Sequence, residues 1–248
     1  MSIAEKLTTI AENEQRVFEA GKTAEWNEMW DGLQAYGKRF DYNRFCYRNL
    51  FIVDTDTTPR WIFKPKYNIK PSSAEFMFRE ANYDVINGDK LYKKLTIDLA
   101  QWLNDLGVNL DLSNCTNINS MFYCAWLISR VPVLDLSKCT SAQYAFWYNC
   151  IETIDGIISS ETTAWSSNTF GLECPLKHCI FSGVIAKPFS LTGNRIDLDH
   201  ESLLSILYCL KDYSGTTTKY TMTLGSKHLA KLTDAEKAIA TQKGWTLA

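Results

Sequence analysis

An alternation of apolar and polar residues occurs twice in the middle of the chain, 24 residues apart. Residues 110–116 read Leu-Asp-Leu-Ser-Asn-Cys-Thr, and residues 134–140 differ from them only at the fifth position. The alternation predicts a short strand with both leucines buried and the aspartate facing solvent. Phe122, Phe146 and Phe170 keep the same spacing and are expected to fill the core. One repeat cannot bury its own leucines, so the pattern predicts stacked repeats beside a parallel sheet.

Less regular segments flank these two repeats. Residues 73–78 are expected to supply the aromatic residue of an earlier repeat, and residues 153–157 and 179–185 to form further, weaker strands. Capping residues and glycines delimit the helices that the apolar spacing predicts. We expect helices from Asp98 to Gly107, from Asp199 to Leu210 and from Thr233 to Gly244, with a strand over 220–224.

The first 30 residues have the apolar spacing of an amphipathic helix. Ile3, Ile10, Val17 and Ala24 recur every seven residues, as in a coiled coil, but the second seam is poorly apolar. Two interpretations stay open. The helix either joins copies of the chain into a homo-oligomer through residues 1–30, or packs against its own domain.

These patterns divide the chain into four parts. We predict an N-terminal helical segment at 1–37, an aromatic-rich N-terminal cap at 38–72, a leucine-rich repeat region at 73–198 and a C-terminal α/β cap at 199–248. Caps are expected because the apolar ends of a repeat array would be insoluble if uncovered. The predicted fold class is therefore α/β, a leucine-rich-repeat solenoid with a parallel sheet.

Composition and charge narrow the choice of function. With 26 Lys and Arg against 28 Asp and Glu, the net charge of −2 offers no basic surface for nucleic acid or an anionic membrane. The sequence has neither a membrane-spanning apolar run nor an N-terminal secretory signal, so we expect a virion-associated or cytoplasmic protein whose eight cysteines are thiols. Aromatic residues make up 13% of the chain, which favours an exposed contact surface.

Several residues of the repeats carry a resemblance to a known family. They are residues 110–113 and 134–137, the run Met121-Phe122-Tyr123-Cys124, and Ala145-Phe146 with Cys150. This pattern resembles the BspA-type leucine-rich repeats of bacterial surface proteins over about residues 73–185. Residues 4–22 and 229–245 are similar to the termini of repeat proteins encoded in gut Firmicutes genomes and their prophages. These resemblances imply a repeat solenoid and a tail or receptor-binding role.

Residues suited to catalysis or metal binding are few. The sequence contains no common nucleotide-binding, serine hydrolase or zinc protease motif. Cys174 and Cys179 flank His178, but their spacing is not that of a zinc site, so we expect neither a metal nor a cofactor. Asp111 and Asp135, with Asp155 in a weaker repeat, are expected to line one sheet face. They are either solvent-facing strand residues or a carboxylate set that a hydrolase could use.

Aromatic residues after the core phenylalanines form the predicted contact surface. On neighbouring repeats they could align as an exposed stripe, although tyrosine and tryptophan can equally be core residues. The candidate ligand-binding residues are Tyr123, Trp126, Tyr144, Trp147, Tyr148, Asp111 and Asp135. Trp165, in the polar segment 159–168, is expected to project from one edge.

The sequence thus predicts a non-enzymatic recognition protein of the phage tail, receptor-binding or bacterial surface adhesion type. Its expected partner is a carbohydrate or protein on a host surface, bound through the repeats, with no nucleic acid and no membrane insertion. Two alternatives stay open. One is an intracellular protein-protein interaction module of prophage origin, and the other is a hydrolase that uses the aspartates.

Overall fold

The computed structural model describes residues 71–79, 97–105, 107, 109–126 and 128–248, together with two short strands near the N-terminus. These strands, β1 (Ile52–Val53) and β2 (Pro59–Arg60), pair antiparallel. The predicted helix over 1–30, the segment 1–37 and nearly all of the aromatic cap 38–72 lie outside the described residues.

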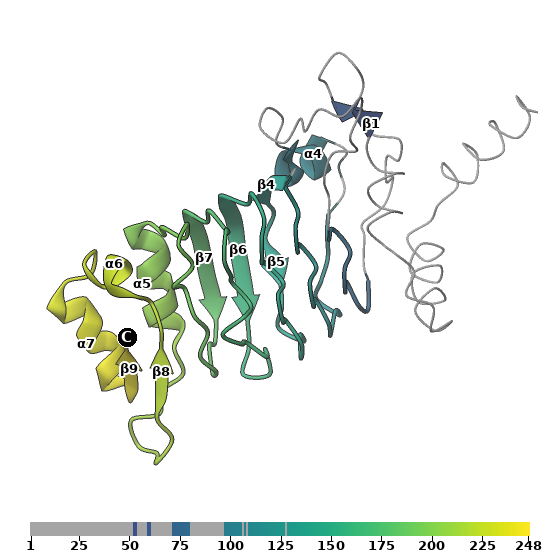
Figure 1. Cartoon of the computed structure of the whole chain (residues 1–248). Helices are drawn as coiled ribbons and strands as arrows, with labels where there is room; N and C mark the ends of the chain where they lie inside the picture. The colour runs from purple at the N-terminus through teal and green to yellow at the C-terminus, as the bar shows by residue number, and fades with distance from the viewer. Residues whose placement is uncertain are drawn as a thin grey trace, which may run out of the picture.

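A five-stranded sheet, in which every strand pair is parallel, runs along the molecule (Figure 1). Its strands are β3 (Ile97–Asp98), β4 (Ile128–Val131), β5 (Leu134–Asp135), β6 (Thr153–Ser159) and β7 (His178–Gly183). β4 and β5 both pair with β6 and are separated at Pro132, which has no N–H to donate to a neighbouring strand. The predicted α/β class with a parallel sheet is confirmed.

The strands differ in length from the prediction. β6 and β7, which we expected to be weaker, are the longest strands of the sheet. Residues 110–112 instead form no regular strand. The Asp111 carboxylate accepts hydrogen bonds from Ser113 in the turn that follows, as the Asp135 carboxylate does from Ser137 after β5. The burial pattern was predicted correctly. Leu112 and Leu136 are fully buried, and the aspartates between the leucines are half-buried.

Backbone contacts follow the 24-residue spacing beyond the sheet. Thr140 N–H donates to Thr116 O at 2.8 Å, and parallel bridges join Asn117 to Ser141 and Phe146 to Phe170. Cysteine is buried at the same point of two repeats, where the thiols of Cys115 and Cys139 donate to backbone carbonyls. Equivalent residues of successive repeats therefore lie side by side.

A column of phenylalanine rings runs through the interior. Phe78 stacks on Phe122, Phe122 on Phe146 and Phe146 on Phe170, with ring centroids 5.2, 5.5 and 5.1 Å apart. Adjacent planes differ by 14° or less, and all four rings are buried. The predicted core positions are confirmed, including the one assigned to the earlier repeat at 73–78.

Trp165 corrects one expectation about the surface. Its ring is 6% exposed and packs near Phe170, Phe181 and Phe189, with centroid distances of 5.2 to 6.1 Å. The polar segment folds inward because Thr163, which is also buried, donates its hydroxyl hydrogen to Leu136 O at 2.8 Å. The prediction that Trp165 projects from an edge was therefore wrong.

The C-terminal part contains three helices and two strands, of which the two longer helices and the first strand were predicted. They are α5 (His200–Cys209), β8 (Tyr220–Met222), α6 (Ser226–Leu229), α7 (Asp234–Gln242) and β9 (Trp245–Leu247). Asp199 caps α5 by accepting from Ser202 N at 2.9 Å, and Thr233 forms a capping box with Glu236 on α7. β8 and β9 form a two-stranded parallel sheet.

Helix α5 lies against β7 and takes the place of a further strand (Figure 1). The hydroxyl oxygens of Ser202 and Ser205 accept hydrogen bonds from the N–H groups of Cys179 and Phe181, each at 2.9 Å. Side chains of the helix thereby satisfy backbone groups that a neighbouring strand would otherwise bind.

Candidate functional site

Four of the predicted contact residues come together in one cluster, which we call the aromatic surface: Tyr123, Tyr144, Trp147 and Tyr148. Tyr144 meets Trp147 edge-on at 5.3 Å, Trp147 meets Tyr148 at 6.1 Å, and Tyr148 meets Tyr123 at 6.2 Å. The four rings thus form a continuous chain that crosses from one repeat to the next. Each ring is at least partly exposed, and Tyr144 is 38% exposed.

Arg79 extends the aromatic surface to an earlier repeat. Its guanidinium carbon lies 5.2 Å from the Tyr123 ring centroid and 5.1 Å from that of Phe76. A cation over two rings is attracted by their π faces, which fixes the guanidinium beside the aromatic surface. Sequence reasoning missed Arg79, because a cation–π contact between residues so far apart in the chain has no local pattern.

The backbone of the aromatic surface is unusual at two of its tyrosines. Tyr144 has φ +56° and Tyr148 φ +52°, in the left-handed region that bulky side chains rarely occupy. The preceding repeat has Ser120 and Cys124 at the equivalent positions, also with positive φ. The turn therefore demands this conformation, and tyrosine occupies it here despite the steric cost.

The indole of Trp147 packs directly against the backbone of Gly171, which has no side chain. A Cβ added at Gly171 would lie 1.8 Å from Trp147 Cε3, so only glycine allows the indole to pack on this backbone. The tryptophan is thus a fixed member of the aromatic surface, and Tyr144 and Tyr148 pack against it.

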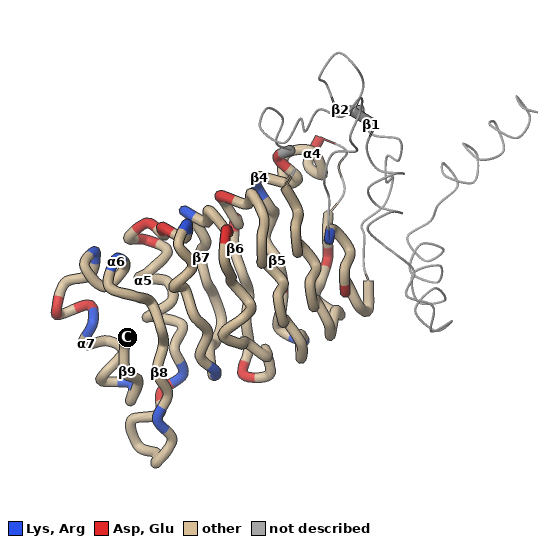
Figure 2. Tube along the Cα trace, in the orientation of Figure 1, with Lys and Arg blue, Asp and Glu red and all other residues tan. Residues whose placement is uncertain are grey.

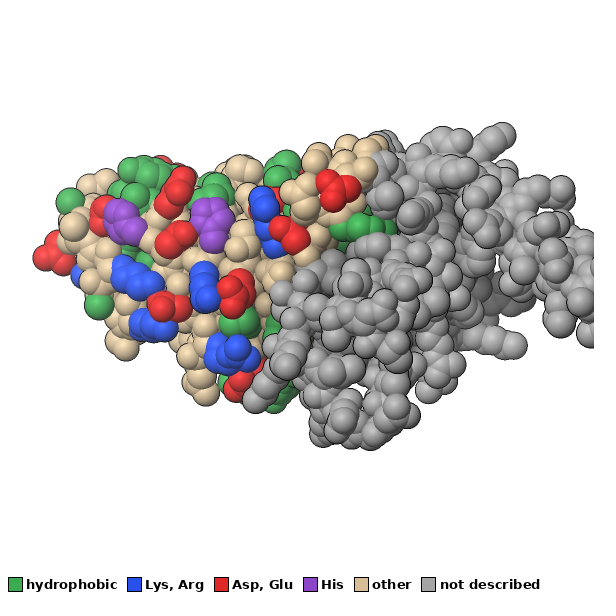
Figure 3. All heavy atoms as spheres, turned by 90° about the horizontal axis from the view of Figure 1, so that it is seen from above, with side chains coloured by type: hydrophobic (Ala, Val, Ile, Leu, Met, Phe, Trp, Pro, Cys, Tyr) green, Lys and Arg blue, Asp and Glu red, His purple; other side chains and the backbone are tan. Residues whose placement is uncertain are grey.

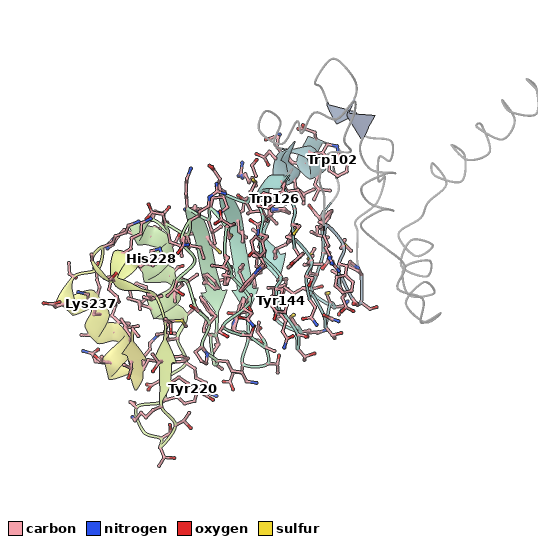
Figure 4. All side chains as sticks on the ribbon, in the orientation of Figure 1. Trp102, Trp126, Tyr144, Tyr220, His228 and Lys237 are labelled. Atoms are coloured by element: carbon pink, nitrogen blue, oxygen red, sulfur yellow. The ribbon has the colours of Figure 1, made fainter. Side chains whose placement is uncertain are left out.

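The other predicted contact residues lie elsewhere or are engaged locally. In Figure 4, Trp126 is near the upper end of β4, while Tyr144 is near the middle of the array. Trp126 is therefore not part of the aromatic surface. One carboxylate oxygen of Asp111 accepts from Ser113 N, and one of Asp135 accepts from Ser137 N, both at 3.0 Å. These two carboxylates stabilise their own turns.

The predicted set of three aligned aspartates is wrong. The register places Ile158 opposite Asp135, so Asp155 is not at the equivalent position. A shift in the pairing of β6 with β7 between Ile154 and Ile157 displaces the Asp155 region from the regular alternation. Asp155 instead accepts a hydrogen bond from Arg130 Nε at 2.7 Å.

The cysteines and histidines of the repeat region do not form a metal site. Among the residues that the structure describes, no group of three or more His, Cys, Asp or Glu could hold a metal ion. Cys174 and Cys179 are buried, whereas His178 Nδ1 lies 2.6 Å from Asp199 Oδ2. Burial raises the pKa of the Cys174 thiol to about 12 and that of Cys115 to about 11, which makes both thiols poor nucleophiles.

Charged residues gather mainly at the turns rather than along the strands (Figure 2). The end seen in Figure 3 shows positive and negative side chains side by side. Ion pairs among the described residues include Lys177 with Glu152 at 2.9 Å and Arg130 with Asp155 at 2.7 Å. On the described part of this face the two signs are mixed, so it offers no surface of one sign to a polyanion.

The described residues also form a pocket that was not predicted from the sequence. A pocket of about 510 Å³ lies between helix α4 (Leu99–Asp105) and the adjoining strands, and we call it the α4 pocket. Its polar lining is Gln101, Asn104, Asn109, Arg130 and Asp155, and its apolar lining is Ala100, Leu103, Leu110, Pro132 and Val133. None of the predicted contact residues lines it. Its polar residues come from three separate segments and share no motif.

Comparison with known proteins gives no relative. No family model, no curated protein and no solved structure matches the chain. In the described part of the chain, no helix has both the length and the apolar character needed to cross a bilayer.

Proposed function

We propose that this chain is a non-enzymatic recognition protein that binds a carbohydrate or protein receptor through its aromatic surface. The observation that carries the proposal is the continuous chain of partly exposed rings from Tyr144 through Trp147 and Tyr148 to Tyr123. Partly exposed tyrosine and tryptophan combine a large apolar area with a polar atom, which suits both sugar rings and protein side chains.

We further propose that the repeats form a leucine-rich-repeat solenoid of the BspA type. The 24-residue backbone contacts and the stacked phenylalanines support this architecture. A solenoid keeps its core residues constant from repeat to repeat while its surface residues vary. The aromatic surface follows this rule, because its residues differ between repeats and the core phenylalanines do not. Tyrosines at 144 and 148 replace the smaller Ser120 and Cys124 of the preceding repeat, while Phe122 and Phe146 are retained.

The setting we propose is display on a virion or on a bacterial surface, with a host-surface molecule as the receptor. The alternative, an intracellular interaction module, predicts a monomer, whereas the tail or surface role predicts an oligomer through residues 1–30. Light scattering of the full chain, compared with the double variant Ile10→Glu and Val17→Glu, separates them. A dimer or trimer that becomes monomeric supports display, and a monomer in both samples supports the alternative.

Receptor binding is tested with the full chain on a glycan array and in pull-down from host cells. Tyr144→Ala and Tyr148→Ala are compared with Tyr208→Ala, a matched control on α5 whose side chain is 65% exposed and outside the aromatic surface. We expect both cluster variants to weaken binding at least tenfold, and the control to bind as the native chain does. Equal binding by all three variants would exclude the aromatic surface as the receptor site.

A further inference from the structure

The α4 pocket has the size and lining of a small-molecule site. Its volume of about 510 Å³ falls within the range of about 300 to 1,000 Å³ that is usual for ligand pockets. Leu103 and Leu110 are nearly fully buried, so they form an apolar floor, while Val133 is 48% exposed at the side. Polar groups surround this floor, which is the arrangement that fixes a ligand's orientation.

The charges at the α4 pocket are balanced. Arg130 Nε donates to Asp155 Oδ1 at 2.7 Å. Arg130 Nη1 lies 3.4 Å from Oδ2 of Asp98, which is the last residue of β3, directly before α4. The guanidinium is therefore already neutralised by carboxylates. An anionic ligand such as a phosphate or a carboxylate would have to displace one of them, so the pocket favours a neutral ligand.

The remaining polar lining favours hydroxyl groups on that ligand. Asn104 carries an amide, which offers donor and acceptor atoms at one point. Gln101 Nε2 donates to Asp105 Oδ1 at 2.7 Å, and its Oε1 offers a further acceptor. A sugar hydroxyl is likewise both donor and acceptor, and a pyranose also has apolar C–H faces that suit the Leu103 and Leu110 floor. A peptide presents its donors and acceptors in alternating directions and needs deeper side-chain subsites, so it suits this lining less well.

We propose that the α4 pocket is a binding site for a neutral mono- or disaccharide. The site is separate from the aromatic surface, and the inference does not rest on the proposed receptor binding. The Asn104 amide and Gln101 Oε1 hydrogen-bond the sugar hydroxyls, and Asp155 accepts from a further hydroxyl while remaining paired with Arg130.

The test measures binding of named neutral sugars to the full chain. Saturation-transfer NMR screens glucose, galactose, mannose, N-acetylglucosamine, maltose, cellobiose and lactose, and calorimetry then gives the Kd of any sugar that binds. Asn104→Leu removes one lining amide while keeping good helix propensity, and Asp155→Asn removes the carboxylate charge at constant shape. Asn194→Leu is the matched control, because Asn194 is exposed and lies outside the α4 pocket.

We expect at least one sugar to bind, with a Kd at least tenfold higher in Asn104→Leu and Asp155→Asn and unchanged in Asn194→Leu and Tyr148→Ala. Loss of sugar binding in Tyr148→Ala, with normal binding in Asn104→Leu, would overturn this inference and support the aromatic surface instead. Binding of none of these sugars would overturn it as well. Asn104-dependent binding of a mixed peptide library, without sugar binding, would show that the pocket takes peptides and would refute the saccharide assignment.

Discussion

Removing the ring of Phe146 is the most direct test of the stacked repeats. The side chain is fully buried, and its ring lies between those of Phe122 and Phe170 at 5.5 and 5.1 Å. Burying a phenylalanine contributes about 1.5 to 3 kcal/mol, and each ring pair adds about 0.5 to 1.5 kcal/mol. With the cavity that remains, we expect Phe146→Ala to lower the free energy of unfolding by about 3 to 5 kcal/mol.

Urea denaturation followed by circular dichroism and tryptophan fluorescence measures this loss. Tyr208→Ala is the surface control, and because its side chain is 65% exposed we expect a change within about 0.5 kcal/mol. A loss below about 1 kcal/mol for Phe146→Ala, with an unchanged m-value, would refute the claim that adjacent repeats share one core.

Three further predictions concern other contacts. Gly171→Ala should displace the Trp147 indole, because the added Cβ would lie 1.8 Å from the ring. We expect the free energy of unfolding to fall by about 1 to 3 kcal/mol and receptor binding to weaken, as measured by denaturation and binding assays. Ser205→Ala should cost about 1 to 3 kcal/mol and speed hydrogen exchange at the Phe181 amide, because that N–H loses its acceptor. Stability should fall as the pH drops below about 6.5, because burial lowers the pKa of His228 and the unfolded chain then binds more protons.

Each of these predictions has a clear contrary result. An alanine at 171 that leaves both stability and binding unchanged would mean that the indole can move without cost. Normal exchange at Phe181 in the Ser205 variant would mean that the helix does not protect β7. For the acid prediction, both ring nitrogens of the buried His228 are engaged in the folded protein. Nε2 accepts a hydrogen bond from Leu198 N, and Nδ1 lies 2.7 Å from Leu224 O. A His228→Gln variant with the same decline in acid would refute the assignment to this residue.

The sequence was sufficient to predict the features that repeat or follow local rules. The phenylalanine positions, the buried leucines and cysteines, and the caps at Asp199 and Thr233 all depend on spacing or on neighbouring residues. Strand length was predicted less well. β6 is long because apolar residues such as Ile154 and Ile157 are buried against neighbours on either side, which a single repeat does not reveal.

The candidate sites were predicted only in part, because their contacts join distant segments. Four of five aromatic residues meet as a cluster, since their repeats stack in phase. Trp126 lies apart, Trp165 turns inward, and Asp155 leaves the expected row where the pairing shifts. The α4 pocket depends on how a helix before the first clear repeat packs near strands that follow it, and no spacing within the chain encodes that packing.

The serine side chains of α5 also limit how copies of this protein can associate. A bare parallel strand is a template onto which another chain can add, and repeated addition leads to polymerisation or aggregation. Here Ser202 and Ser205 occupy amide groups of β7 that an incoming strand would need. Another chain therefore cannot add a strand directly to β7, because the amides of Cys179 and Phe181 are already bonded to the helix.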